Sequence, residues 1–97
     1  MPHRIAFDRE ALDDLRRLPK RDQAMALSGI RQWLTHEPLL ESRARIRRLR
    51  EGAFPPYRLR IDPYRVLFDV DVPGGDVVVY GIGCKPAIYA RLGEEET

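Results

Sequence analysis

Every second residue is apolar in two neighbouring segments of the chain, from residue 57 to 61 and from residue 66 to 70. A period of two residues is typical of strands that bury one face. Asp62-Pro63 lies between the two segments and is a turn signal, because Asp suits the first turn position and Pro fixes φ at the next. The pattern predicts a β-hairpin with strands at about 57–62 and 64–71.

A third strand is predicted at about 76–84, where residues 76–83 are apolar on both faces and therefore suit the interior of a sheet. The preceding segment Val72–Gly75 contains Pro-Gly-Gly and predicts a turn. Residues 3–7 form a short apolar segment that we expect to be an edge strand.

Between these strands, apolar residues recur at the spacing of a helix. One stripe consists of Ala11, Leu12, Leu15 and Leu18, and the other of Ala24, Leu27, Ile30, Trp33 and Leu34. Asp8 is a suitable N-cap for the first helix, Pro19 ends it or opens the second, and Pro38 closes the second. The connection is so short that the two helices are predicted to form a hairpin. The polar segment Leu39–Gly52 is predicted to be a loop with a turn of helix, and Lys85–Leu92 a short final helix.

The predicted order is β-α-α-β-β-β-α, which indicates an α+β domain with the helix hairpin packed on a mainly antiparallel four-stranded sheet. The chain has 97 residues, 43% of them hydrophobic and 33% charged, which suits one globular domain spanning residues 1–97. No apolar run has the length of a membrane helix, and the start lacks an apolar signal region. A single cysteine, Cys84, fits a reducing compartment, so we expect a cytoplasmic protein.

Positive charge is concentrated around the hairpin. The net charge is only +2, but residues 43–65 contain eight arginines against Glu51 and Asp62. Pairing across the turn places Arg58, Arg60 and Arg65 on one face, where like charges destabilise a sheet unless an anion is present. Phosphate is the leading candidate, because guanidinium groups match its geometry. The alternatives are a solvated, Arg-rich strand face, and an Arg65 that pairs with Asp62 or Asp69 at the surface.

The chain resembles the RelE/ParE superfamily of small bacterial toxins from type II toxin–antitoxin pairs. The likeness rests on Tyr57–Arg60, Asp62–Asp71, Val79–Lys85 and Tyr89, and the helix hairpin also fits in length and position. The resemblance implies a RelE-like fold, a cognate antitoxin as partner, and cleavage of mRNA on the ribosome without a cofactor or metal. Cys84 stands where the family usually has His, and Lys85 where it usually has Arg.

The family's roles carry over to matching positions. Arg58 and Arg60 match residues that hold the phosphate or help to activate the ribose 2′-hydroxyl, and Arg65 matches the arginine that stabilises charge on the scissile phosphate. Lys85 matches a proposed proton donor to the leaving oxygen, and Tyr89 a tyrosine that orients or stacks on RNA. Lys85 has the alternative of a surface lysine, and Tyr89 that of an anchor for the last helix.

Tyr80 shares a face with Leu67 if Asp71 pairs with Asp76, which would put an aromatic ring beside the arginines for stacking on a base. Ordinary strand packing is the favoured interpretation of Tyr80. Two other functions remain open for the whole chain. One is inhibition of DNA gyrase, as by ParE-like members of the superfamily, and the other is a non-catalytic, antitoxin-binding relative.

Overall fold

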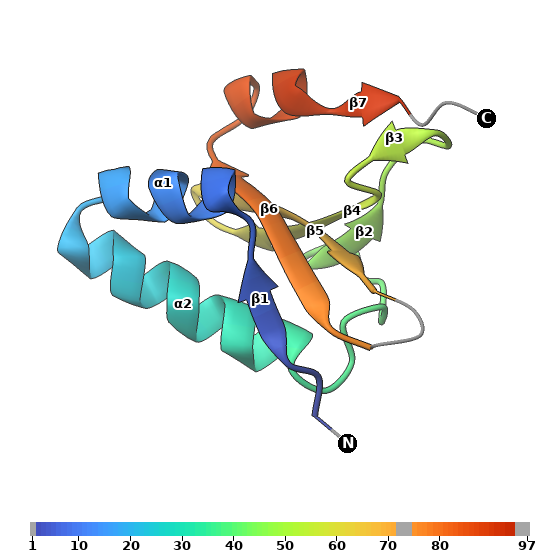
Figure 1. The fold of residues 1–97 in the computed structure, drawn as a ribbon, viewed down its shortest axis with the longest axis horizontal. Coiled ribbons are helices and arrows are strands. Elements are labelled where there is room, and N and C mark those ends of the chain that lie inside the picture. The colour runs from blue at the N-terminus through green and yellow to red at the C-terminus, as the bar shows by residue number, and fades with distance from the viewer. Residues whose placement is uncertain (1, 72–74, 95–97) are drawn as a thin grey trace.

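The computed structural model describes residues 2–71 and 75–94, and its elements follow the predicted order with additions (Figure 1). The two α-helices are α1 (Arg9–Arg17) and α2 (Lys20–Leu34), and η1 (Ala87–Arg91) is a 3-10 helix. The strands are β1 (Ile5–Phe7), β2 (Ile46–Arg48), β3 (Ala53–Phe54), β4 (Tyr57–Ile61), β5 (Tyr64–Val70), β6 (Val77–Gly83) and β7 (Gly93–Glu94). The main sheet has the order β1-β6-β5-β4-β2, and β3 pairs with β7 in a separate two-stranded ribbon.

The predicted α+β class is confirmed, but the prediction of four strands is wrong. The main sheet has five strands, because β2 lies within the segment 39–52 that was predicted to be a loop, and it pairs antiparallel with β4. The sheet is mixed, since β1 runs parallel to β6 while the other pairs are antiparallel. The prediction of an edge strand at the N-terminus is confirmed, and β6 lies in the interior of the sheet as expected. The final helix is a single 3-10 segment that leads into β7.

Local signals set the limits of the two helices. The side chain of Asp8 accepts a hydrogen bond from the backbone N–H of Glu10 and caps α1, and Pro19 opens α2. The buried residues of α2 are Ala26, Ile30 and Leu34, so the prediction that Ala24 belongs to the buried stripe is wrong. Gly29 allows α2 to approach the sheet closely, because a Cβ there would lie 2.6 Å from Cδ1 of Ile61 in β4.

The core lies between the helices and one face of the sheet. Leu59, Val66 and Phe68 are fully buried there, as predicted, whereas Val70 is half-buried. Ala11 of α1 and Ile30 of α2 belong to the same cluster. The opposite face of β4 and β5 carries the arginines together with Leu67, which is buried there. The predicted turn at Val72–Gly75 lies largely outside the described residues, but Asp71 donates its N–H to the carbonyl of Asp76, at 2.6 Å, as the predicted pairing requires.

In the part of the chain that the structure describes, no helix combines the length and the apolar character needed to cross a membrane.

Candidate nucleic-acid interface

The β4–β5 hairpin gathers three arginines on the face that points away from the helices. Ile61 lies opposite Tyr64, Arg60 opposite Arg65, and Arg58 opposite Leu67. Residues directly opposite in an antiparallel pair share a face, and alternate residues along a strand do too. Arg58, Arg60 and Arg65 therefore lie on one face, which confirms the shared strand parity on which the predicted anion site rested.

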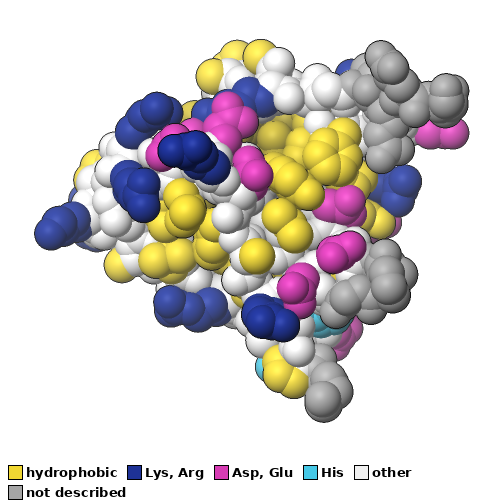
Figure 2. All heavy atoms as spheres, in the orientation of Figure 1, with side chains coloured by type: hydrophobic (Ala, Val, Ile, Leu, Met, Phe, Trp, Pro, Cys, Tyr) yellow, Lys and Arg dark blue, Asp and Glu magenta, His cyan; other side chains and the backbone are white. Residues whose placement is uncertain are grey.

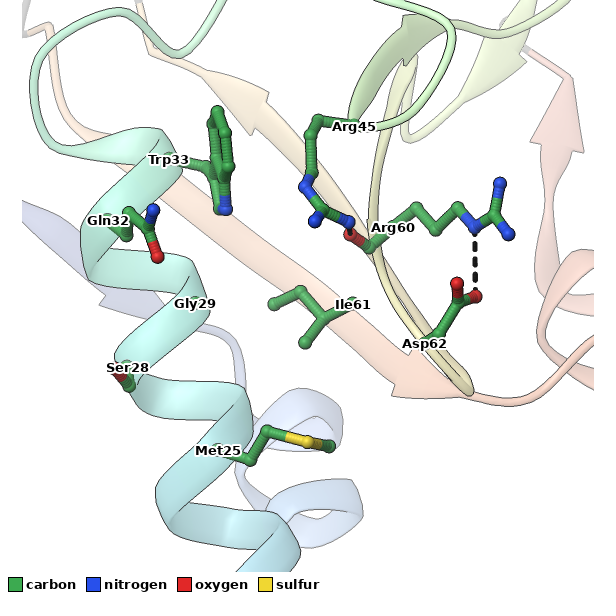
Figure 3. A pocket seen from close by; sticks show the side chains of 9 residues that line it. All are labelled: Met25, Ser28, Gly29, Gln32, Trp33, Arg45, Arg60, Ile61 and Asp62. Atoms are coloured by element: carbon green, nitrogen blue, oxygen red, sulfur yellow. Dashed lines mark hydrogen bonds and ion pairs between the residues drawn. The ribbon is translucent and has the colours of Figure 1, made fainter.

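Asp62, in the hairpin turn, binds two of these arginines through one oxygen. Its Oδ1 accepts hydrogen bonds from Nε of Arg60, at 2.8 Å, and from Nη1 of Arg65, at 3.2 Å. Figure 3 shows the Arg60 side chain directed away from α2 toward this carboxylate. The hydrogen bond to Arg60 lowers the pKa of Asp62 and raises the pKa of Arg60. The surface pairing considered as an alternative for Arg65 is thus present, but one carboxylate neutralises only one of the two cations.

Arg58 lies at the centre of the positive charge. Its Nη1 donates a hydrogen bond to the backbone carbonyl of Arg45, at 2.8 Å. Burial is the largest cause that lowers the pKa of the Arg58 guanidinium, and the cations Arg65, Arg47 and Arg60 lower it further, while Tyr89 opposes them. These mutual effects place Arg47 and Tyr89 in the same electrostatic neighbourhood as the three arginines of the hairpin.

Lys85 and Tyr89 follow β6, whose last residue, Gly83, lies opposite Arg65. Lys85 is exposed in the turn before η1, and Tyr89 is half-buried within η1. Between them, Ile88 is buried over two glycines of β6, and a Cβ on Gly81 would lie 3.2 Å from Cδ1 of Ile88. The glycines therefore let η1 lie close against the sheet, which brings Tyr89 toward Arg58.

The structure does not group Tyr80 with the arginines. Tyr80 lies at an irregularity in the β5–β6 pairing, where Leu67 is opposite Gly81 and Phe68 is opposite Val79. Its ring packs edge-on against Phe54, with the centroids 5.0 Å apart. Burial raises the pKa of Tyr80, and its charged neighbours, Asp69, Asp8 and Asp71, raise it further. The surroundings of Tyr80 are thus apolar and acidic, which fits strand packing. Figure 2, on the side where β6 faces the viewer, likewise shows hydrophobic side chains bordered by acidic ones.

A buried carboxylate that the sequence did not reveal holds η1 in place. Asp14 of α1 is 4% exposed and accepts hydrogen bonds from Nη1 and Nη2 of Arg91, both at 2.7 Å, and from the backbone N–H of Ile82, at 2.9 Å. Its bond to Arg91 raises the pKa of that guanidinium. Asp14 therefore joins α1, β6 and η1, and through η1 it fixes the position of Tyr89.

A hollow of 380 Å³ lies beside the contact between α2 and the end of β4, and residues of both elements line it (Figure 3). The guanidinium of Arg45 lies 5.1 Å from the centre of the Trp33 ring and donates a hydrogen bond to the carbonyl of Arg60. Trp33, predicted to be a core residue, is half-buried and packs against the core. Among residues 2–71 and 75–94, no group of three or more His, Cys, Asp or Glu side chains is arranged to hold a metal ion.

Comparison with known proteins connects this geometry to a fold. No protein-family model and no curated protein matches the sequence. Among solved structures, a chain of the toxin–antitoxin complex RelBE2 from Mycobacterium tuberculosis is 28% identical, with a TM-score of 0.68, and the match covers 88% of this chain and 100% of that one. A chain of the archaeal RelE–RelB complex from Pyrococcus horikoshii OT3 is 23% identical, with a TM-score of 0.69, 89% of this chain and 98% of that one being covered.

A chain of the RelB–RelE complex from Methanococcus jannaschii is 18% identical, with a TM-score of 0.53 and coverage of 88% and 95%. The last two likenesses concern the fold, whereas the mycobacterial protein is also similar in sequence. The predicted resemblance is therefore confirmed: this chain has a RelE-like fold and is similar to the toxins of type II toxin–antitoxin systems.

Proposed function

We propose that this protein is the toxin of a toxin–antitoxin pair and cleaves mRNA, in the cytoplasm and on the ribosome. The observation that supports this most directly is the pair of arginines on β4 and β5. Arg60 lies opposite Arg65, and the two guanidinium groups share a single carboxylate, so that positive charge remains on an accessible face. The solved structures that share the fold come from complexes of a toxin with its antitoxin, which supports a cognate antitoxin as partner.

The chemistry would use the 2′-hydroxyl of the RNA as the nucleophile. Its attack on the adjacent phosphate builds negative charge on the phosphorus oxygens, and cations already fixed in position stabilise that charge well. Arg65 suits this role, because its side chain is only 11% exposed and is held from the hairpin turn. Arg58 and Arg60 would bind phosphates of the RNA backbone. Guanidinium groups stay protonated, so they act here through charge and hydrogen bonds rather than as bases.

Lys85 would donate the proton to the leaving oxygen, and Tyr89 would orient the RNA. Lys85 is exposed two residues after Gly83, which lies opposite Arg65, and Tyr89 acts on the charge of Arg58. A positioned proton donor contributes about 10²–10⁴-fold to such a reaction. Loss of the Lys85 ammonium is therefore expected to slow cleavage without preventing the binding of RNA.

The proposal is tested with purified protein and ribosomes carrying a short, end-labelled message. Wild type is expected to cut within the codon exposed in the decoding site, and Arg65→Ala to leave the message intact. Arg4→Ala is a matched control, because Arg4 is an exposed arginine beside β1 that pairs with Asp76. An uncut message with wild type, combined with trapped gyrase–DNA cleavage complexes in a parallel assay, would contradict the proposal and favour inhibition of gyrase.

A further inference from the structure

Strand β2 adds a fourth arginine to the basic face. Arg47 of β2 lies directly opposite Arg58 of β4, so the two side chains share the face that also carries Arg60 and Arg65. Cβ atoms of directly opposite residues are about 4.5–5.5 Å apart, and like charges placed there repel each other. Within the described residues, Arg47 makes no ion pair, and its side chain is exposed. The positive charge of the Arg47–Arg58 pair is therefore less neutralised by carboxylates than that of the Arg60–Arg65 pair, which shares Asp62.

Both members of this pair have hydrogen-bond donors to offer. A guanidinium group carries five N–H donors. The described hydrogen bond of Arg58 uses one of them, on the carbonyl of Arg45. Arg47 lies opposite Arg58, and Arg60 lies two residues along the same strand; repulsion from these cations and from Arg65 adds to the burial that lowers the pKa of Arg58. Beyond Arg47 the surface continues into a shallow hollow of 570 Å³ lined by Arg47, Arg43, Ser42 and Glu41.

The two arginine pairs are offset in a regular way. Arg58 and Arg60 lie two residues apart on β4, a distance of about 7 Å along the strand. The Arg47–Arg58 pair is also displaced sideways from the Arg60–Arg65 pair by one strand, about 5 Å. Together the two offsets separate the centres of the pairs by about 8–9 Å, and the long, flexible arginine side chains can reach neighbouring phosphates from that separation. Four arginines in two pairs thus present two sites for anions that repeat along a chain.

We propose that Arg47 and Arg58 form a second phosphate subsite, which binds the phosphate next to the one held by Arg60 and Arg65. The ligand is single-stranded RNA recognised by its backbone, and its path runs across the hairpin from β5 toward the edge strand β2. This inference rests on the proposed function, because it assigns a further substrate contact to the same face. Arg47 is accordingly a substrate-binding residue rather than a member of a solvated loop.

Arg48 provides a matched control one residue away. It faces the other side of the sheet, where its Nη1 donates a hydrogen bond to the hydroxyl of Tyr57, at 3.0 Å, and its guanidinium lies 5.4 Å from the centre of that ring. Arg47→Ala and Arg48→Ala remove the same charge from the same strand. A difference in RNA binding between the two variants is therefore caused by the face of the sheet on which each arginine lies, and not by the net charge of the protein.

The experiment measures binding of a fluorescein-labelled, fully 2′-O-methylated RNA 12-mer, which lacks the free 2′-hydroxyl needed for cleavage. Fluorescence anisotropy at several salt concentrations gives the binding constant and its dependence on salt. The slope of the logarithm of the binding constant against the logarithm of the salt concentration changes by about 0.7 for each phosphate contact with a single strand. Arg47→Ala is expected to weaken binding about fivefold at low salt, as for one exposed charge contact, and to reduce the slope by about 0.7. Arg48→Ala is expected to keep the slope of wild type.

A double variant tests whether Arg47 and Arg58 hold the same phosphate. Arg47→Ala combined with Arg58→Ala is expected to reduce the slope by about 0.7 in total, because both side chains bind one group. A loss of about 1.4 would mean two separate phosphates and would overturn the shared subsite. Equal binding by Arg47→Ala and Arg48→Ala would overturn the inference while leaving the proposed function intact. A wild type that binds no RNA at all would overturn both. Melting curves check that each variant is folded.

Discussion

Replacement of Asp14 by Asn is expected to destabilise the protein strongly, because this carboxylate is buried and holds three elements together. The change keeps the shape of the side chain and an oxygen that accepts from the N–H of Ile82, but it removes the charge that pairs with Arg91. Breaking a fully buried ion pair costs about 3–5 kcal/mol. The side chain of Arg91 is 33% exposed and can be rehydrated, so we expect a smaller loss of about 2–3 kcal/mol in the free energy of unfolding.

Urea unfolding followed by circular dichroism measures this loss, and the melting temperature is expected to fall by about 8–20 °C. Asp13→Asn is the matched control, because Asp13 is the preceding residue and its ion pair with Arg16, at 3.6 Å, is exposed. That variant is expected to stay within about 0.5 kcal/mol of wild type. Equal stability of the two variants would refute the reasoning, since it would mean that the contacts of Asp14 contribute no more than a surface pair.

Two further changes test the electrostatics of the site and of its support. Asp62→Asn removes the carboxylate shared by Arg60 and Arg65 and is expected to tighten binding of the methylated RNA severalfold at low salt; weaker binding would mean that Asp62 orients the arginines instead of competing with phosphate. Tyr64 donates a hydrogen bond to Asp22, at 2.6 Å, and this bond is the main cause that raises the pKa of Tyr64 to about 12. Because the folded pKa lies above the ordinary value of 10, the bond stabilises the protein fully below pH 10 and loses its effect as the pH rises toward 12. Absorbance at 295 nm is expected to show one tyrosine ionising last, and Tyr64→Phe to remove that step; four tyrosines ionising near pH 10 would contradict the assignment.

The hairpin could be predicted from the sequence because its determinants are local. Alternation with a period of two fixes which residues share a face, and a two-residue turn at Asp62-Pro63 fixes the register. Asp62 is only three residues from Arg65, so the pairing of these two side chains could also be predicted from the sequence. Its simultaneous bond to Arg60 depends on the directions of the two side chains, which only the structure supplies.

The rest of the site depends on contacts between distant segments. Strand β2 has three residues, and of these only Ile46 is buried, so the segment carries too short a pattern to predict a strand. Its pairing with β4 is what makes Arg47 part of the site. Asp14 and Arg91 are 77 positions apart, so no local pattern predicts that they pair. Helical spacing places Asp14 beside the apolar stripe, three residues after Ala11 and four before Leu18, and Asp13 on the opposite side of the helix. This spacing is the only local signal that separates the two carboxylates, and it does not identify the partner of Asp14.

The most direct test of the central claim maps the ends of cellular RNA after controlled expression of wild type and of Arg65→Ala at equal protein levels. If the arginine face binds and cuts RNA, wild type produces discrete cuts within translated regions and arrests growth, whereas Arg65→Ala produces neither. Growth arrest by both proteins with messages left uncut would contradict the account, because toxicity would then arise without the chemistry assigned to Arg65.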